Sequence, residues 1–161
     1  MSKKVKGAKK QGKLVKEVWL PGLFMKLSQA GDYQDALSQF QSLLQSKPRD
    51  PSILFQIGIV HSIIGKNKRK AIEVYSLVLS LDPNDDSARF NRGKCYQELG
   101  KIKVALADFT QCLQGGDDSS LRQSRGACYL ALKKYKEAAL DFKKAAEYLE
   151  REIELRKTWP Q

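Results

Sequence analysis

Few side chains in this 161-residue sequence are suited to catalysis. His61 is its one histidine, and its three cysteines are Cys95, Cys112 and Cys128. A single imidazole leaves little room for histidine acid–base chemistry, and the cysteines lack the spacing of a zinc site. An odd cysteine count in a chain this long also argues against a disulfide framework. We therefore expect a non-enzymatic protein without metal or cofactor, whose cysteines are buried as small hydrophobic residues.

Basic charge is concentrated at the N-terminus. The chain has 29 Lys and Arg against 18 Asp and Glu, and residues 1–16 contain no acid. Seven lysines lie there: Lys3, Lys4, Lys6, Lys9, Lys10, Lys13 and Lys16. This composition predicts a disordered basic arm over residues 1–16. The arm is either simply solvated, or it contacts nucleic acid, an acidic protein or an anionic membrane surface, or it acts as a nuclear import signal.

Cysteine usage and hydropathy indicate the expected compartment. No apolar run approaches the roughly 18 residues of a membrane span, and no apolar core follows the lysine-rich start as it would in a signal peptide. The odd cysteine count favours a reducing environment. We expect a cytoplasmic protein, with the nucleus or a cytoskeletal or ciliary assembly as alternatives.

The sequence repeats with a period of about 34 residues. Arg92-Gly93-Lys94-Cys95-Tyr96 recurs as Arg125-Gly126-Ala127-Cys128-Tyr129. A small residue followed four positions later by an aromatic residue occurs four times, as Ala36 and Phe40, Ala71 and Tyr75, Ala105 and Phe109, and Ala138 and Phe142. Internal repetition at this spacing is typical of solenoid proteins.

Each repeat is predicted to contain two helices joined by a tight turn. In the third unit, the apolar spacing of 3 and 4 predicts helices from Asp86 to Leu99 and from Ile102 to Leu113. Gly100 between them can adopt the left-handed conformation that ends a helix. Proline with Asn or Asp separates the units, as in Leu81-Asp82-Pro83-Asn84-Asp85. The expected fold is all-α, with eight helices in four antiparallel pairs and no strand.

These residues resemble the tetratricopeptide repeat (TPR) family, whose motif places glycines, aromatic residues and alanines at fixed positions. The resemblance covers residues 17–152, in units of about 17–50, 51–85, 86–118 and 119–152. The third unit matches best, while Phe24 and Leu27 replace motif residues in the first and Lys133 replaces the turn glycine in the fourth. The resemblance implies a right-handed superhelix whose first helices line a concave groove.

The groove is where the resemblance places function. Projection of the first helices gives these groove-facing candidates: Met25 in the first unit; Phe55, Gln56 and Ile59 in the second; Phe90, Asn91 and Lys94 in the third; Gln123, Ser124 and Ala127 in the fourth. The apolar candidates either pack against neighbouring helices or anchor a ligand. His61 stands where the family has an aromatic residue, which predicts a packed, partly buried ring.

The resemblance implies a protein–protein interaction scaffold or adaptor that binds a partner peptide or helix in the groove. Family members that bind chaperone tails use five groove positions as a carboxylate clamp, of which at best Asn91 is matched here. The partner is therefore not expected to be such a tail. The alternative is a basic protein associated with nucleic acid or a membrane surface, whose arm is the main binding element.

The C-terminal helix is predicted to be longer than the others. Lys136 to Lys157 shows an unbroken helical pattern with many charged residues, and residues 153–161 form its end and a short tail. Capping the open end of the solenoid is the main interpretation, and a short coiled-coil or docking arm is the minor one. We expect a monomer or weak self-association.

Overall fold

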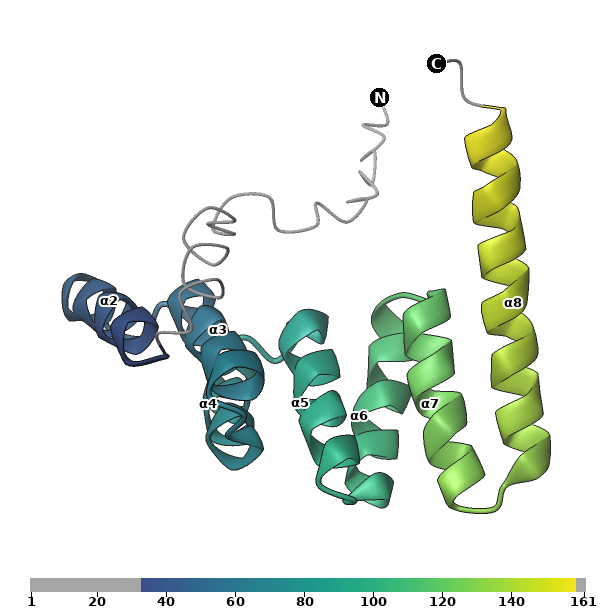
Figure 1. Cartoon of the computed structure of the whole chain (residues 1–161), viewed down its shortest axis with the longest axis horizontal. Coiled ribbons are helices and arrows are strands. Elements are labelled where there is room, and N and C mark those ends of the chain that lie inside the picture. The colour runs from purple at the N-terminus through teal and green to yellow at the C-terminus, as the bar shows by residue number, and fades with distance from the viewer. Residues whose placement is uncertain (1–32, 159–161) are drawn as a thin grey trace, which may run out of the picture.

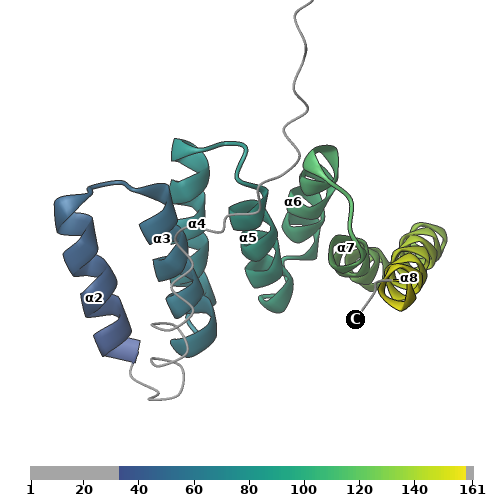
Figure 2. The ribbon, with the colours of Figure 1, turned by 90° about the horizontal axis from the view of Figure 1, so that it is seen from above.

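The computed structural model describes residues 33–158, and these form a single row of helices (Figures 1 and 2). In chain order they are α2 (Tyr33–Ser46), α3 (Pro51–Ile59), η1 (Val60–Ile64), α4 (Lys68–Leu81), α5 (Asp86–Glu98), α6 (Ile102–Gly115), α7 (Ser119–Ala131) and α8 (Tyr135–Lys157). The all-α prediction is confirmed, since the described part of the chain contains no strand. The predicted first helix, Met25 and the arm over residues 1–16 lie outside the described residues.

Helices pair within repeats, and the pairs pack on one another. α3 with η1 packs on α4, α5 on α6, and α7 on α8, while α4 contacts α5 and α6 contacts α7 across the repeat boundaries. α2 is the second helix of the first unit and packs on α3 and η1. Each repeat therefore completes its core by contact with its neighbours, as expected for a solenoid.

An aspartate immediately precedes and caps each of the first helices α3, α5 and α7. The Asp50 carboxylate accepts from the backbone N–H groups of Ser52 and Ile53, the Asp85 carboxylate from that of Ala88, and the Asp118 carboxylate from that of Leu121. Such caps satisfy N–H groups that have no partner within the helix, and each stabilises it by about 1 kcal/mol. The polar residues between units therefore fix where each repeat starts.

Left-handed residues form the turns inside the third and fourth repeats. Gly100 has φ of 73°, as predicted, and the next residue, Lys101, donates from its backbone N–H to the Tyr96 carbonyl at 2.9 Å. Lys133 adopts the same conformation with φ of 59°, and Lys134 donates to the Tyr129 carbonyl at 2.9 Å. The fourth unit therefore keeps the turn geometry without the glycine, at the steric cost that a Cβ atom adds there.

The second repeat has one extra residue, which changes the end of its first helix. In η1 the last turn widens, and the Gly65 N–H donates to the Val60 carbonyl at 2.9 Å, five residues earlier. His61 lies in this π-helical turn with its ring buried. Its Nδ1 and the Tyr33 hydroxyl form a hydrogen bond of 2.8 Å, and burial lowers the pKa of the imidazole. The prediction of a packed ring is confirmed.

The core has small residues wherever the two helices of a repeat approach each other. Ala36, Ala71, Ala105 and Ala138 are all buried, and Cys95, Cys112 and Cys128 are buried as predicted, with thiol pKa values that burial raises. A Cβ atom on Gly93 would come within 2.8 Å of the Phe109 ring. The helices of a repeat can approach this closely only because these positions are small.

Replacing Ala105 with leucine is expected to destabilise the fold by about 1–3 kcal/mol. Ala105 is fully buried beside Phe109, so added methylenes would force off-rotamer side chains or a shift of α6. Urea unfolding measures the effect, and Ala107→Leu, on the exposed face of the same helix, is the control. Equal unfolding midpoints for the two variants would contradict the close packing of the helices at Ala105.

The capping role of α8 stays a prediction, and the surface of this helix is less polar than its charged residues suggest. The helix is unbroken as predicted, and it bears exposed charged residues. It also exposes apolar side chains along its length: Tyr135, Leu140, Phe142, Tyr148, Leu149, Ile153 and Leu155. Within the described part of the chain, apolar residues between the charged ones therefore remain uncovered.

Candidate partner-binding surface

Two aromatic rings occupy the same place on successive first helices. Phe55 of α3 and Phe90 of α5 are both partly buried, and each ring packs on the aromatic residue of its own repeat. The Phe55 and Tyr75 ring centroids are 5.8 Å apart, and those of Phe90 and Phe109 are 5.6 Å apart, with nearly equal tilts of 51° and 52°. Each ring is therefore held in one orientation while part of it stays accessible.

The other predicted groove residues differ in accessibility. Gln56 is only 7% exposed, so it offers a partner almost no surface and does not belong with the other candidates. Ile59, Asn91 and Lys94 are partly buried. In the fourth unit, Gln123 is exposed on α7 where the earlier units have phenylalanine, and Ser124 is buried. The apolar part of the predicted groove surface thus lies on α3 and α5, and the part on α7 is polar.

Asn91 already makes one hydrogen bond within its own helix. Its side-chain amide donates to the Ser87 carbonyl at 2.9 Å, one turn earlier. Hydrogen bonding to a peptide backbone would therefore use the second N–H and the carbonyl oxygen of this side chain. Asn91 can therefore offer a partner one donor and one acceptor.

Polar contacts hold the neighbouring first helices α5 and α7 together. The Gln97 side-chain amide donates to the Ser124 carbonyl at 3.3 Å and to the Cys128 sulfur at 3.6 Å. Burial raises the pKa of the Cys128 thiol, and the positive charge of Lys94 opposes this effect. A peptide lying on both helices would meet this cation.

Paired cations stack on a tyrosine in each of the last two repeats. Arg92 and Lys101 lie 6.0 and 5.9 Å from the centre of the Tyr96 ring, and Arg125 and Lys134 lie 5.4 and 6.0 Å from that of Tyr129. Such contacts stabilise by about 0.5–1 kcal/mol each at exposed sites. Sequence reasoning missed these stacks, although the Arg and Tyr of each stack belong to the recurring segments.

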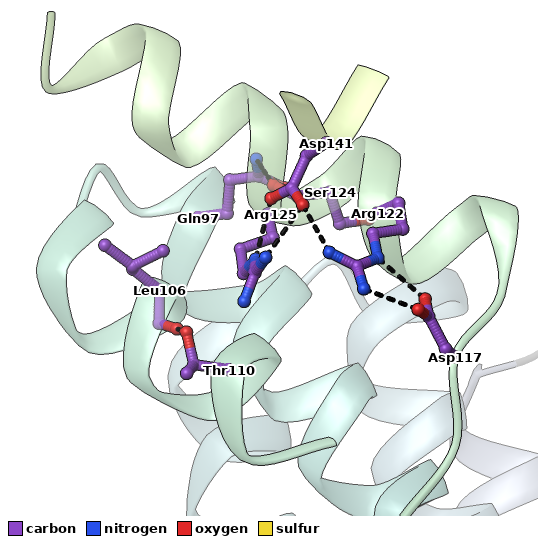
Figure 3. Close-up of polar contacts among 8 residues, drawn as sticks. All are labelled: Gln97, Leu106, Thr110, Asp117, Arg122, Ser124, Arg125 and Asp141. Carbon is purple, nitrogen blue, oxygen red and sulfur yellow. Dashed lines mark hydrogen bonds and ion pairs between the residues drawn. The ribbon is translucent and has the colours of Figure 1, made fainter. Parts of the chain in front are cut away.

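A repeated ion pair anchors the same arginines on their other side. Arg92 donates to Asp108 from Nε at 2.9 Å and from Nη2 at 2.7 Å, and the equivalent Arg125 donates twice to Asp141 at 2.7 Å. In the fourth unit Arg122 joins the cluster, donating to Asp141 and to Asp117 (Figure 3). Asp141 is completely buried. This cluster ties α7, α8 and the connector before α7 into one rigid end.

Neither a metal site nor a membrane-spanning helix is found in the described part of the chain. Within residues 33–158 no group of His, Cys, Asp and Glu could hold a metal ion, and no helix there is long and apolar enough to cross a membrane. The arginines and aspartates that do cluster are paired with one another, which is the arrangement of a structural ion-pair network.

Comparison with known families identifies the class of protein. The family profile described as "Tetratricopeptide repeat" matches residues 23–86, and the profile described as "Anaphase-promoting complex, cyclosome, subunit 3" matches residues 65–145. The chain belongs to the tetratricopeptide repeat family. Its fold is that of a non-catalytic scaffold for protein interactions.

Individual relatives share the repeats. The chain is 31% identical over 87 residues to human (Homo sapiens) aspartyl/asparaginyl beta-hydroxylase, a match that covers 54% of this chain and 11% of that protein. The chain spans about a tenth of this relative's length, so the relative's activity is not carried over.

Solved structures share the fold. The structure titled "MamA RS-1 ArsTM double mutant" aligns with a TM-score of 0.71 at 21% identity, covering 80% of this chain and 72% of the other. A thermophilic TPR protein of Thermus thermophilus aligns with a TM-score of 0.65 at 20% identity, covering 82% of this chain and 73% of the other.

Proposed function

We propose that this protein is an adaptor that holds a partner peptide or helix along the first helices α3, α5 and α7. The observation that carries the proposal is the pair of equivalent, partly accessible rings of Phe55 and Phe90. Rigid aromatic side chains set in a packed surface are typical anchors of binding hot spots, because they bury a large area with little loss of side-chain entropy.

The chemistry along the surface indicates what the partner presents. The rings of Phe55 and Phe90, with Ile59 between them in sequence, favour an apolar side chain at the α3–α5 end. Lys94 and Asn91 favour hydrogen-bond acceptors, either a carboxylate or peptide carbonyls. A short segment with one apolar anchor and acidic or carbonyl groups beside it fits these features, and a chaperone-tail carboxylate clamp does not.

The basic arm has a secondary role in this proposal. Its seven lysines add long-range attraction, which raises the association rate at low salt and is screened at physiological ionic strength. In the alternative, nucleic acid or an anionic membrane surface binds the arm as the main ligand. Binding would then be lost when the arm is deleted and would not change when groove residues are replaced. One experiment separates the two.

Peptides selected on the full chain from a random display library are expected to need both rings. Phe55→Ala and Phe90→Ala should each weaken their binding by about 2 kcal/mol, roughly 30-fold, at low and at physiological salt. The matched control is Leu77→Ala on the exposed face of α4, which should leave the Kd unchanged. Fluorescence anisotropy gives the Kd, and thermal melting verifies that each variant is folded.

Deletion of residues 1–16 completes the test. It should weaken peptide binding only at low salt. The proposal is wrong if the deletion abolishes binding at physiological salt while both phenylalanine variants bind normally. Salt-sensitive retention of a generic RNA duplex or of anionic vesicles by the full chain would then favour the alternative.

A further inference from the structure

The last repeat exposes a residue that the other repeats bury. The second helix of each repeat has an aromatic residue at the same position. In the first three repeats this residue is buried: Phe40 is 4% exposed, and Tyr75 and Phe109 are fully buried. In the fourth repeat the equivalent Phe142 of α8 is 39% exposed. Phe109 is covered because it lies in one cluster with residues of the following helix α7. No helix within residues 33–158 performs this role for Phe142. Its open face is a packing surface without a partner.

This face continues along α8 as an apolar strip. Tyr135, Ala139, Phe142, Ala146, Leu149 and Ile153 follow one another at intervals of 4 and 3 residues, and all are exposed. Alternation of 4 and 3 is the heptad pattern that pairs helices in a coiled coil. The strip lies beside the alanines that face α7, Ala138 and Ala145, and does not overlap them. It is therefore available while α8 stays packed in its own chain.

We propose that α8 pairs antiparallel with α8 of a second copy of this chain. In the register that opposes one strip to the other, Ile153 lies against Phe142 of the second copy, and Leu149 lies against Ala146. The two-fold axis repeats both contacts, so Phe142, Leu149 and Ile153 of each copy are covered, whereas Tyr135 lies beyond the end of the facing helix. In the dimer, Ile153 of the second copy covers Phe142.

Charge complementarity at the centre of the helix pair favours the antiparallel direction in this register. Lys143 and Glu150 flank the strip on the same side and are both exposed. In the antiparallel pair, Lys143 of each copy comes beside Glu150 of the other near the centre, so this attraction occurs twice, whereas Lys136 and Lys157 come together at the two ends. Flanking ion pairs of this kind set orientation and partner choice in coiled coils. A head-to-tail arrangement would not close and would lead to open assembly.

The length of α8 makes room for the second copy. α8 has 23 residues and α7 has 13, so the C-terminal end of α8 projects beyond the rest of the solenoid (Figure 1). The antiparallel pair places this projecting end beside the first half of the other α8. The two solenoids then lie toward opposite ends of the helix pair.

Sedimentation of the full chain tests the proposal. The native chain should show a concentration-dependent mass that rises from 18.2 kDa to twice that value and no further. Ile153→Lys should make it monomeric over the same range. The matched control is Leu155→Lys, which alters an equally exposed residue on the opposite side of α8 and should leave dimerisation unchanged.

Mixing two charge variants tests the direction of pairing. Lys143→Glu alone and Glu150→Lys alone each place like charges together twice, and each should dimerise about tenfold more weakly or worse. An equal mixture of the two variants should form a heterodimer with native affinity, because both contacts regain opposite charges. A native chain that stays monomeric, assembly beyond a dimer, equal effects of Ile153→Lys and Leu155→Lys, or no rescue in the mixture would each overturn the proposal.

Discussion

Replacing Asp141 with alanine is expected to destabilise the protein by about 3–5 kcal/mol. This carboxylate is fully buried and accepts three hydrogen bonds of 2.7 Å from Arg122 and Arg125. Its removal leaves two guanidinium groups without their central anion, and Arg122 is itself buried. Breaking a buried pair from one side costs far more than the pair contributes, because the remaining charge stays desolvated. Equilibrium unfolding in urea measures the loss.

A surface acid of the same helix provides the control. Glu147 and Lys143 form an exposed ion pair at 4.0 Å, so Glu147→Ala should cost less than about 1 kcal/mol. If Asp141→Ala cost no more than Glu147→Ala, the cluster would be solvated in solution, and the rigidity assigned to this end of the solenoid would be lost.

The same cluster makes stability depend on pH in a definite direction. Burial alone would raise the pKa of Asp141, but the hydrogen bonds from Arg125 and Arg122 outweigh burial and hold it below its usual range. The hydrogen bond from Arg122 likewise lowers the pKa of Asp117. Their stabilisation is thus complete above the unfolded pKa of about 4 and is lost as pH falls through the lower folded values. Asp141→Ala should therefore lose less stability than the native chain on acidification.

Much of the fold could be predicted from the repeated residues. Recurrence of Ala-aromatic pairs one helical turn apart predicted the second helices and their buried faces, because close helix packing requires that combination. The Arg–Asp pairs were also present in the sequence, since Arg92 and Asp108 both recur 33 residues later as Arg125 and Asp141. Two polar residues that recur together, on the two helices of one repeat, indicate a contact between those helices.

Other features depend on neighbours that one helix does not reveal. A projection placed Gln56 beside Phe55 on the binding face, yet the packing of α3 against adjacent helices buries it. The widened turn at His61 required knowledge of how the chain accommodates an extra residue. The exposure of Phe142 depends on whether another helix packs on its repeat. Phe109 lies in the same motif of the preceding repeat, and its ring is fully buried. Local pattern therefore predicts helices and core, while accessibility depends on position in the solenoid.

Phe109→Ala is expected to destabilise the protein by about 3–5 kcal/mol, because it opens a cavity in a closed core. The ring is fully buried, packs on Phe90 and lies against Gly93. The equivalent change Phe142→Ala should cost about 1–2 kcal/mol at low protein concentration, since part of that ring is already in water. The two variants thus make the same substitution at equivalent positions of two repeats, where one ring is buried and the other is partly exposed.

Protein concentration separates the two effects further. If α8 pairs with α8 of a second copy, Phe142→Ala also removes an intermolecular contact, so its cost should grow as concentration rises, because association stabilises the folded state by mass action. The cost of Phe109→Ala should stay constant, since Phe109 lies inside one chain. Urea titrations at a low and a high protein concentration provide the measurement. Equal costs for both variants at low concentration would contradict the burial difference, whereas a constant cost for Phe142→Ala would count against the dimer alone.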